Sequence, residues 1–213
     1  MGAWTQQLAG RFLAFEGPDG SGKSTQLSRF TAWARLQGLQ LVEVREPGGT
    51  AVGERIRDVL LDPENTDLTA RAEMLLYMAS RAQLVETIIE PALRVGSLVI
   101  ADRFVASTCA YQGTAGGVPM HDILRVAETA MGGRWPDLSI IFDVDEQTAA
   151  GRLSPLLDRM ERKGAAFHRR VREGYHLLAE QRPQDTVLID ATIDEDSVFE
   201  RLLEVLRGRL GGK

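Results

Sequence analysis

Cysteine is almost absent from this sequence, in which Cys109 is the only one among 213 residues. A single thiol cannot form an internal disulfide, and it cannot build a thiolate metal cluster. Histidine is also scarce, and the three histidines lack the spacing of a ligand pair in a His-Glu helix motif. A disulfide framework is therefore excluded, a zinc site is not indicated, and a reducing compartment is expected.

Long hydrophobic runs and an excess of basic residues are missing as well. No stretch approaches the roughly 20 apolar residues of a membrane span, and the first ten residues lack the features of a signal peptide. With 25 Lys and Arg against 30 Asp and Glu, the formal net charge is −5. This negative net charge disfavours nonspecific electrostatic binding to a polyanion. We expect no nucleic-acid partner, no membrane partner and a cytoplasmic location.

The length and composition are those of a globular protein. At about 150 residues per domain, 213 residues correspond to one domain or a domain with a small insertion. The hydrophobic fraction of 44% and the charged fraction of 26% argue against disorder. We expect a single domain over residues 1–213.

Short apolar runs alternate with longer periodic segments along the chain. The runs that predict strands cover 12–15, 39–44, 98–101, 138–144 and 187–189. The segments that predict helices cover 23–37, 75–89, 160–181 and 196–209, and Pro91 should kink or restart the second of them. The glycine-rich stretch 113–119 predicts either a mobile loop or a plain helix connector. This alternation indicates an α/β fold with a parallel sheet and helices on both faces.

The strongest motif lies between the first predicted strand and the first predicted helix. Residues 17–24 read GPDGSGKS, which matches the phosphate-loop pattern. Glycines let successive backbone N–H groups point into one concavity, and the helix N-terminus adds its positive dipole. Lys23 supplies a point charge to the donor phosphates, and Ser24 can ligate Mg²⁺. The residues expected to bind ATP are Gly17, Pro18, Asp19, Gly20, Ser21, Gly22, Lys23, Ser24 and Thr25.

Two further pairs indicate a second phosphate compound. Asp102 and Arg103 follow the buried run 98–101, where an acid can hold Mg²⁺ and an arginine can clamp a phosphate. A surface Asp-Arg pair is the alternative. Tyr77 and Arg81 lie one helical turn apart. The tyrosine ring could therefore stack on a base while the guanidinium hydrogen-bonds to the edge of that base. Taken alone, a tyrosine such as Tyr77 is more often a core or core-edge aromatic.

Five segments together resemble bacterial thymidylate kinase. They are FEGPDGSGKSTQ at 15–26, REPGGT at 45–50, RAQLVE at 81–86, DRF with ST and AYQ between 102 and 112, and LDRME at 157–161. The resemblance runs in order from about residue 11 to residue 192. It implies a P-loop NTPase fold with a five-stranded parallel sheet, usually as a homodimer. It also implies the reaction of ATP and dTMP to ADP and dTDP with Mg²⁺.

The resemblance also implies roles for individual residues. Arg103 should bind the dTMP phosphate, and Arg57 should reach it as well. Tyr77 takes the place of the family's phenylalanine that stacks on thymine, and the thymine edge should meet Arg81 and Thr108. The sugar should lie near Asp19 and Tyr111. The full set expected around dTMP is Asp19, Arg57, Tyr77, Arg81, Arg103, Thr108, Tyr111 and Gln112, and the metal is expected at Ser24 and Asp102.

The lid departs from the family pattern. Bacterial members without an arginine in the phosphate loop usually carry several lid arginines, and this phosphate loop has none. The lid expected over about 151–159 is short and contains Arg152, with Arg159 at its border. Because the acceptor is a phosphate oxygen, the transfer needs alignment and charge neutralisation and no general base. The residues expected to carry it are Lys23, Arg103, Arg152 and Asp19, although Arg159 could replace Arg152.

Two other readings stay open at this level. One is a different nucleotide or nucleoside kinase of the same architecture. The other is a nucleotide-dependent switch that phosphorylates no small acceptor. The sequence lacks the guanine-specific Asn-Lys-x-Asp motif of many switches, and such a protein would have no use for a second phosphate clamp at Arg103.

Overall fold

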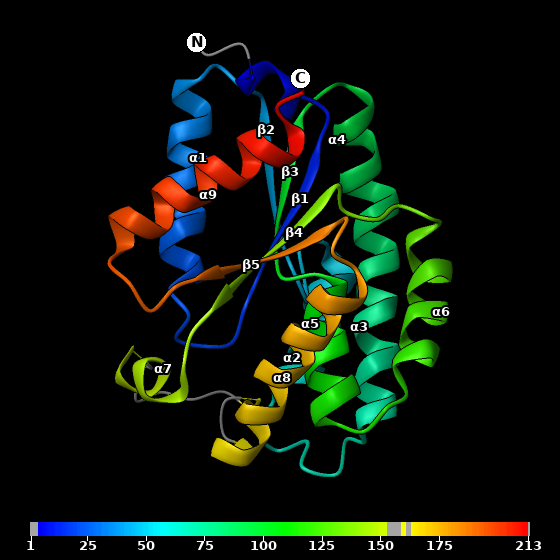
Figure 1. Cartoon of the computed structure of the whole chain (residues 1–213). Coiled ribbons are helices and arrows are strands. Elements are labelled where there is room, and N and C mark those ends of the chain that lie inside the picture. The colour runs from blue at the N-terminus through cyan, green and yellow to red at the C-terminus, as the bar shows by residue number, and fades with distance from the viewer. Residues whose placement is uncertain (1–3, 153–158, 161–162, 213) are drawn as a thin grey trace.

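A computed structural model describes residues 4–152, 159–160 and 163–212. Five parallel strands form one sheet in the order β2-β3-β1-β4-β5 (Figure 1). Their bounds are β1 Phe12–Glu16, β2 Leu41–Arg45, β3 Leu98–Asp102, β4 Leu138–Asp143 and β5 Thr186–Asp190. The α/β class and the five-stranded parallel sheet are therefore confirmed.

The order of the strands brings the chemically important strand ends together. The central strand β1 is buried along its whole length and pairs with β3 on one side and β4 on the other. In the first of these pairings Phe15 lies opposite Asp102, so β1 and β3 end side by side. Ligands of open parallel sheets bind beyond the carboxyl ends of the strands. This edge is where the phosphate loop begins.

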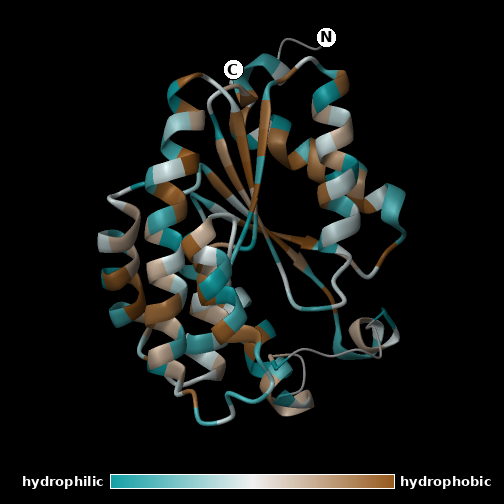
Figure 2. Cartoon of the chain, turned by 180° about the vertical axis from the view of Figure 1, so that it is seen from behind, coloured by the Kyte–Doolittle hydropathy of each residue, from teal (hydrophilic) through white to brown (hydrophobic). Residues whose placement is uncertain are grey.

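Helices cover both faces of the sheet, and apolar side chains fill the space between the layers. Figure 1 shows α1 and α9 on one side, with α3, α6 and α8 on the other. Figure 2 shows mostly hydrophobic residues along the strands, and both hydrophobic and polar residues along the helices. The helices are η1 Thr5–Leu8, α1 Lys23–Leu36, α2 Ala51–Leu61, α3 Ala70–Leu84, η2 Val85–Ile89, α4 Glu90–Arg94, α5 Val105–Thr108, η3 Cys109–Ala115, α6 Met120–Met131, α7 Glu146–Arg152, α8 Ala165–Gln181 and α9 Glu195–Leu210.

The predicted helices occur, with shifted ends. The restart expected at Pro91 is present, because the chain passes through a π-helical turn over η2 and resumes as α4 with Pro91 in its first turn. Helix α8 begins at Ala165, five residues later than predicted, because Gly164 at its N-cap has φ 81°.

The stretch 113–119 is a connector between helices. Its first three residues complete the π-helix η3, and the backbone N–H of Val118 then donates to the Gln112 carbonyl over 3.0 Å. Both Gly113 and Ala115 are buried. The stretch therefore lies where the connector alternative places it, between η3 and α6, and its mobility stays a prediction.

No helix among residues 4–152, 159–160 and 163–212 is long and apolar enough to cross a membrane.

Candidate active site

The phosphate loop connects the end of β1 to the start of α1. At Gly17, φ is 147° and an added Cβ would lie 2.6 Å from the Phe142 carbonyl oxygen. At Gly20, φ is 78° and an added Cβ would lie 2.5 Å from the Ala149 carbonyl oxygen. Only glycine fits this backbone without strain. The loop therefore keeps the open curve that directs N–H groups toward an anion.

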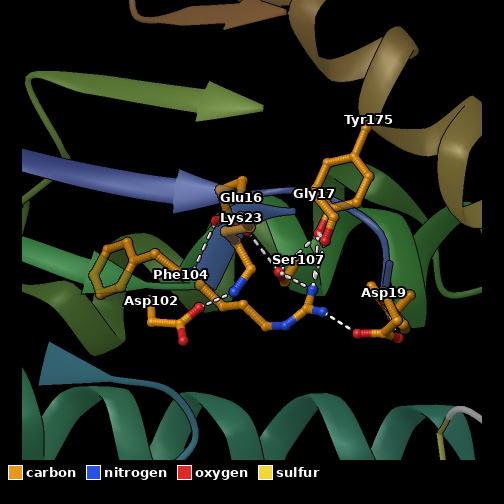
Figure 3. A network of polar contacts seen from close by, with 10 residues as sticks. Glu16, Gly17, Asp19, Lys23, Asp102, Phe104, Ser107 and Tyr175 are labelled. Carbon is orange, nitrogen blue, oxygen red and sulfur yellow. Dashed lines mark hydrogen bonds and ion pairs between the residues drawn. The ribbon is translucent and has the colours of Figure 1, made fainter. Parts of the chain in front are cut away.

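Lys23 begins α1 directly below this loop. The side chain is buried and its ammonium group forms an ion pair with Asp102 at the end of β3 (Figure 3). Burial and the nearby positive charge of Arg103 lower the pKa of Lys23, while Asp102 opposes that shift. The lysine expected to contact donor phosphate and the carboxylate expected at the metal are therefore in direct contact.

Arg103 adopts a backbone conformation that residues other than glycine rarely adopt. Its φ is 69°, the only positive value at a non-glycine residue among those the structure describes. Such strain persists only where the surrounding structure holds it, and it gathers at functional sites. Its guanidinium donates to the Gly17 carbonyl over 2.9 Å and pairs with Asp19. The structure thus places this arginine across the phosphate loop, as an anion clamp requires.

A buried carboxylate supports the segment that carries Arg103. Glu16, the last residue of β1, accepts the Phe104 backbone N–H over 2.8 Å and the Ser107 hydroxyl over 2.5 Å. Burial raises the pKa of Glu16, although both hydrogen bonds favour its charged form. Sequence reasoning gave Glu16 no role, because its partners lie about 90 residues further along the chain.

Asp19 takes part in the same cluster from the phosphate loop. Besides pairing with Arg103, it accepts the Tyr111 hydroxyl over 2.9 Å. The Arg103 guanidinium carbon lies 5.3 Å from the centre of the Tyr111 ring, within cation–π range. Burial raises the pKa of Tyr111, so the phenol stays protonated and donates. Asp19 therefore links the phosphate loop to the residue expected beside the sugar.

Arg81 is fully buried and held in one orientation by Glu46. Its Nε donates to both oxygens of Glu46 over 3.1 and 2.8 Å, and its Nη2 donates to one of them over 2.5 Å. Burial raises the pKa of Glu46 to about 7, against the influence of Arg81, which lowers it. Nη2 also donates to the Thr108 hydroxyl over 3.1 Å. The two residues expected at the thymine edge are therefore adjacent, and Glu46 holds Arg81 in place.

One cavity of about 280 Å³ brings the expected acceptor residues together. Its wall includes all eight of them: Asp19, Arg57, Tyr77, Arg81, Arg103, Thr108, Tyr111 and Gln112. The wall also includes Lys23 and Asp102, and Phe104, Leu61 and Met160 supply apolar surface. Such a mixture suits a nucleotide, which has a charged phosphate and a flat, partly apolar base. We call this cavity the acceptor pocket.

A second hollow follows the phosphate loop itself. It is lined by every loop residue from Pro18 to Thr25, together with Arg103 and Arg152. A third hollow of about 290 Å³ lies beside it, shares Ser21, Gly22, Thr25 and Arg152 with it, and is otherwise lined by Gln26, Ala191 and residues at the start of α9. We call these two together the donor groove. Nothing in the sequence motif indicated the α9 side of this groove.

The structure separates the two arginines at the expected lid. Arg152 donates to the Ala191 carbonyl over 2.9 Å and lines the donor groove. Arg159 is buried elsewhere, where it pairs with Glu73 over 2.7 Å and donates to the Leu60 carbonyl over 2.8 Å. Residues 153–158 of the expected lid, Asp158 among them, lie outside the described residues.

The two expected metal ligands, Ser24 and Asp102, both offer oxygen atoms. Ser24 lines the donor groove and Asp102 reaches the acceptor pocket beside Lys23. No group of three His, Cys, Asp or Glu side chains with ligand geometry occurs within the described part of the chain. A hydroxyl and one carboxylate suit Mg²⁺, which takes most of its remaining oxygen ligands from substrate phosphates and water.

Comparisons with known proteins agree on one family. A family model described as thymidylate kinase matches residues 15–202. A thymidylate kinase from an Exiguobacterium species is 42% identical over 95% of this chain and 97% of its own length. One from Chromobacterium violaceum is 44% identical over 92% and 96%. The crystal structure of thymidylate kinase from Ehrlichia chaffeensis is 31% identical, covers 92% of this chain and 98% of its own, and superposes with a TM-score of 0.75.

Proposed function

The chain belongs to the thymidylate kinase family and phosphorylates dTMP, and from this premise we propose that ATP in the donor groove gives its γ-phosphoryl group to dTMP in the acceptor pocket. The acceptor pocket and the donor groove meet at three residues, and this contact supports the proposal. Asp19, Lys23 and Arg103 line both of them. Direct transfer requires that donor and acceptor phosphates approach one another, and these residues stand at that point.

The acceptor pocket orients dTMP by its two ends. Arg103 and Arg57 hold the phosphate, and Arg103 exchanges its partner Asp19 for that phosphate when dTMP binds. Tyr77 stacks on the base, while Arg81 and Thr108 contact its edge. Asp19 and Tyr111 lie beside the sugar, where a ribose hydroxyl would crowd the phenol. This orientation aims a phosphate oxygen of dTMP at the donor groove.

The chemistry of the transfer follows from the charge of the groups. The attacking phosphate oxygen is already anionic at neutral pH, so no general base has to remove a proton. Charge spreads over the equatorial oxygens of the transferring group in the transition state. Lys23 and Arg103 neutralise that charge, because both line the acceptor pocket and the donor groove where the two adjoin. Lys23 is held by Asp102 and Arg103 by the Gly17 carbonyl, so once dTMP has bound, both charges are in place before the transfer step.

We propose that Mg²⁺ accompanies ATP. Ser24 would hold it from the donor groove and Asp102 from the end of β3 beside Lys23, since both offer oxygen donors. When bound, the ion neutralises phosphate charge and fixes the phosphate oxygens in place.

Arg152 is the lid arginine that we propose to act on the transferring phosphoryl group. We expect Arg152→Ala to lower kcat by about tenfold or more with little change in either KM, because the interaction forms mainly in the transition state. Arg159→Ala is the matched comparison, and it should lower the melting temperature instead, because it leaves Glu73 with less buried positive charge. Steady-state kinetics and thermal melting of both variants decide between them. A normal kcat for Arg152→Ala would remove this residue from the mechanism.

A panel of acceptors tests the proposed function against related kinases. ADP formation from ATP and Mg²⁺ is measured with dTMP, dUMP, dCMP, dGMP, dAMP and thymidine. We expect the highest kcat/KM with dTMP. Preference for another monophosphate, or for the nucleoside, would contradict the assignment of the pocket.

We also propose a homodimer and a single folded unit over residues 1–213. Apolar side chains on the packed helices α2 and α3 offer a surface for a second copy, since Val52, Val59 and Leu75 are 49%, 44% and 50% exposed. Burying scattered apolar residues of this size is the usual driving force for such pairing. The cytoplasmic location and the absence of nucleic-acid and membrane partners stay predictions.

A further inference from the structure

Next to Gln112, a residue in the wall of the acceptor pocket, lies a buried carboxylate that the reaction itself does not use. Glu73 in α3 is 1% exposed, yet it is surrounded by polar partners. Its Oε1 accepts from Arg159 over 2.7 Å and from Lys163 over 3.1 Å, and its Oε2 accepts from the Gln112 amide over 3.0 Å. Burial alone would raise the pKa of Glu73, but these hydrogen bonds and charges outweigh it and hold the pKa below its ordinary value. Glu73 is therefore an ionised acceptor.

An ionised carboxylate dictates which way the Gln112 amide points. A carboxylate can only accept hydrogen bonds, so the atom of Gln112 that faces Glu73 has to be the NH₂ group. Gln112 is itself 1% exposed and lines the acceptor pocket. The other polar end of its amide is the carbonyl oxygen, which is a pure acceptor.

We propose that Glu73 is a positioning residue for base selection, which turns the Gln112 carbonyl oxygen toward the edge of the bound base. This rests on the proposed function, because it assumes that the base lies in the acceptor pocket. An acceptor at this place suits thymine, whose N3 carries a hydrogen. It opposes cytosine, whose N3 is an acceptor. Arg81 and Thr108 lie on the same wall and supply the donors that thymine O4 requires.

The positive charges of Arg159 and Lys163 determine how a glutamine at position 73 would orient its amide. In Glu73→Gln, Arg159 and Lys163 still require an oxygen where Oε1 lies. The new NH₂ group then occupies the place of Oε2 and faces Gln112. Gln112 has to turn its oxygen toward that group, which leaves its own NH₂ facing the base. The pocket wall changes from an acceptor to a donor without any change in a residue that touches the nucleotide.

The experiment compares kcat/KM for dTMP and dCMP in wild type and Glu73→Gln. We expect the dTMP to dCMP ratio to fall by about 10- to 100-fold, with part of the change from faster dCMP turnover. dUMP is the matched substrate control, because its pairing edge equals that of dTMP, and its kcat/KM should fall by the same factor as dTMP. A ratio measured on one protein sample is unaffected by the folded fraction, so a merely structural role of Glu73 would not move it.

Three further variants separate the contributions of Lys163, Gln112 and Glu73 to the ratio. Lys163→Met removes one partner of Oε1 and leaves Arg159, so the ratio should stay at the wild-type value. Gln112→Met keeps the side-chain length but has no amide, so the ratio should fall even if Glu73→Gln does not fold. Adding Glu73→Gln to Gln112→Met should change the ratio no further. A wild-type ratio in Gln112→Met, or in a folded Glu73→Gln, would overturn the proposal, whereas a wild-type protein inactive on dTMP would overturn the proposed function instead.

Discussion

Replacing Lys23 by alanine should lower kcat by at least about 100-fold while the protein keeps its fold. Lys23 is a preorganised charge at the junction of the two substrate sites, and losing such a charge costs about 3 kcal/mol of transition-state stabilisation. The fold should persist because the partner Asp102 is 30% exposed at its side chain and can be hydrated. Steady-state kinetics together with thermal melting measure both effects.

Lys163→Ala is the matched control for this variant. Lys163 is one of only three lysines in the chain and lies behind the acceptor pocket, where it contacts Glu73. Its removal should leave kcat near the wild-type value. Near-normal turnover of Lys23→Ala would contradict the assignment of the phosphate loop, and equal losses in both variants would show a nonspecific effect of removing a lysine.

Replacing Arg103 by alanine should lower kcat/KM for dTMP by about 1,000-fold. The residue is assigned to the acceptor phosphate and also faces the transferring group, so one change removes both ground-state and transition-state contacts. The expected pattern is a higher KM for dTMP and a lower kcat, with the affinity for ATP nearly unchanged. Equilibrium titration of each nucleotide separates these effects from one another.

An exposed arginine provides the comparison for Arg103. Arg134 pairs with Glu90 on the surface, away from the two hollows, and Arg134→Ala should behave as wild type. If Arg103→Ala lost ATP binding and kept dTMP binding, the two hollows would be assigned the wrong way round. Loss of both together with a lowered melting temperature would indicate a structural role for the arginine at positive φ.

Local patterns in the sequence were sufficient for the parallel sheet and for several of the residues that line the hollows, and the family resemblance supplied the others. The phosphate loop is a contiguous motif between a buried strand and a helix, and Asp102 and Arg103 directly follow another buried strand. Parallel pairing of β1 with β3 then brings them together without further information. Tyr77 and Arg81 share a helical face because they lie four residues apart. These relations are fixed by the geometry of single elements.

The three buried acids behind the site could not be predicted in this way. Glu16, Glu46 and Glu73 hold Ser107, Arg81 and Gln112, at separations of 91, 35 and 39 residues. An isolated acid in a sequence reads as a surface residue, because burying its charge is unfavourable without a partner. Only the tertiary structure shows that each has its partner. The π-helix η3 was missed for a related reason, since the wider turn leaves no recognised spacing of apolar residues, and the π-helical form of η2 within the predicted helix 75–89 was missed with it.

The most direct test of the account follows the phosphoryl group itself by ³¹P nuclear magnetic resonance. The protein is incubated with ATP, Mg²⁺ and dTMP, and the phosphorus signals of the products are recorded over time. Direct transfer between adjoining sites predicts that the α- and β-phosphorus signals of dTDP grow in step with those of ADP, with little free phosphate. Growth of free phosphate with ADP while dTMP stays unchanged would show hydrolysis by a nucleotide-dependent switch, and it would contradict the account.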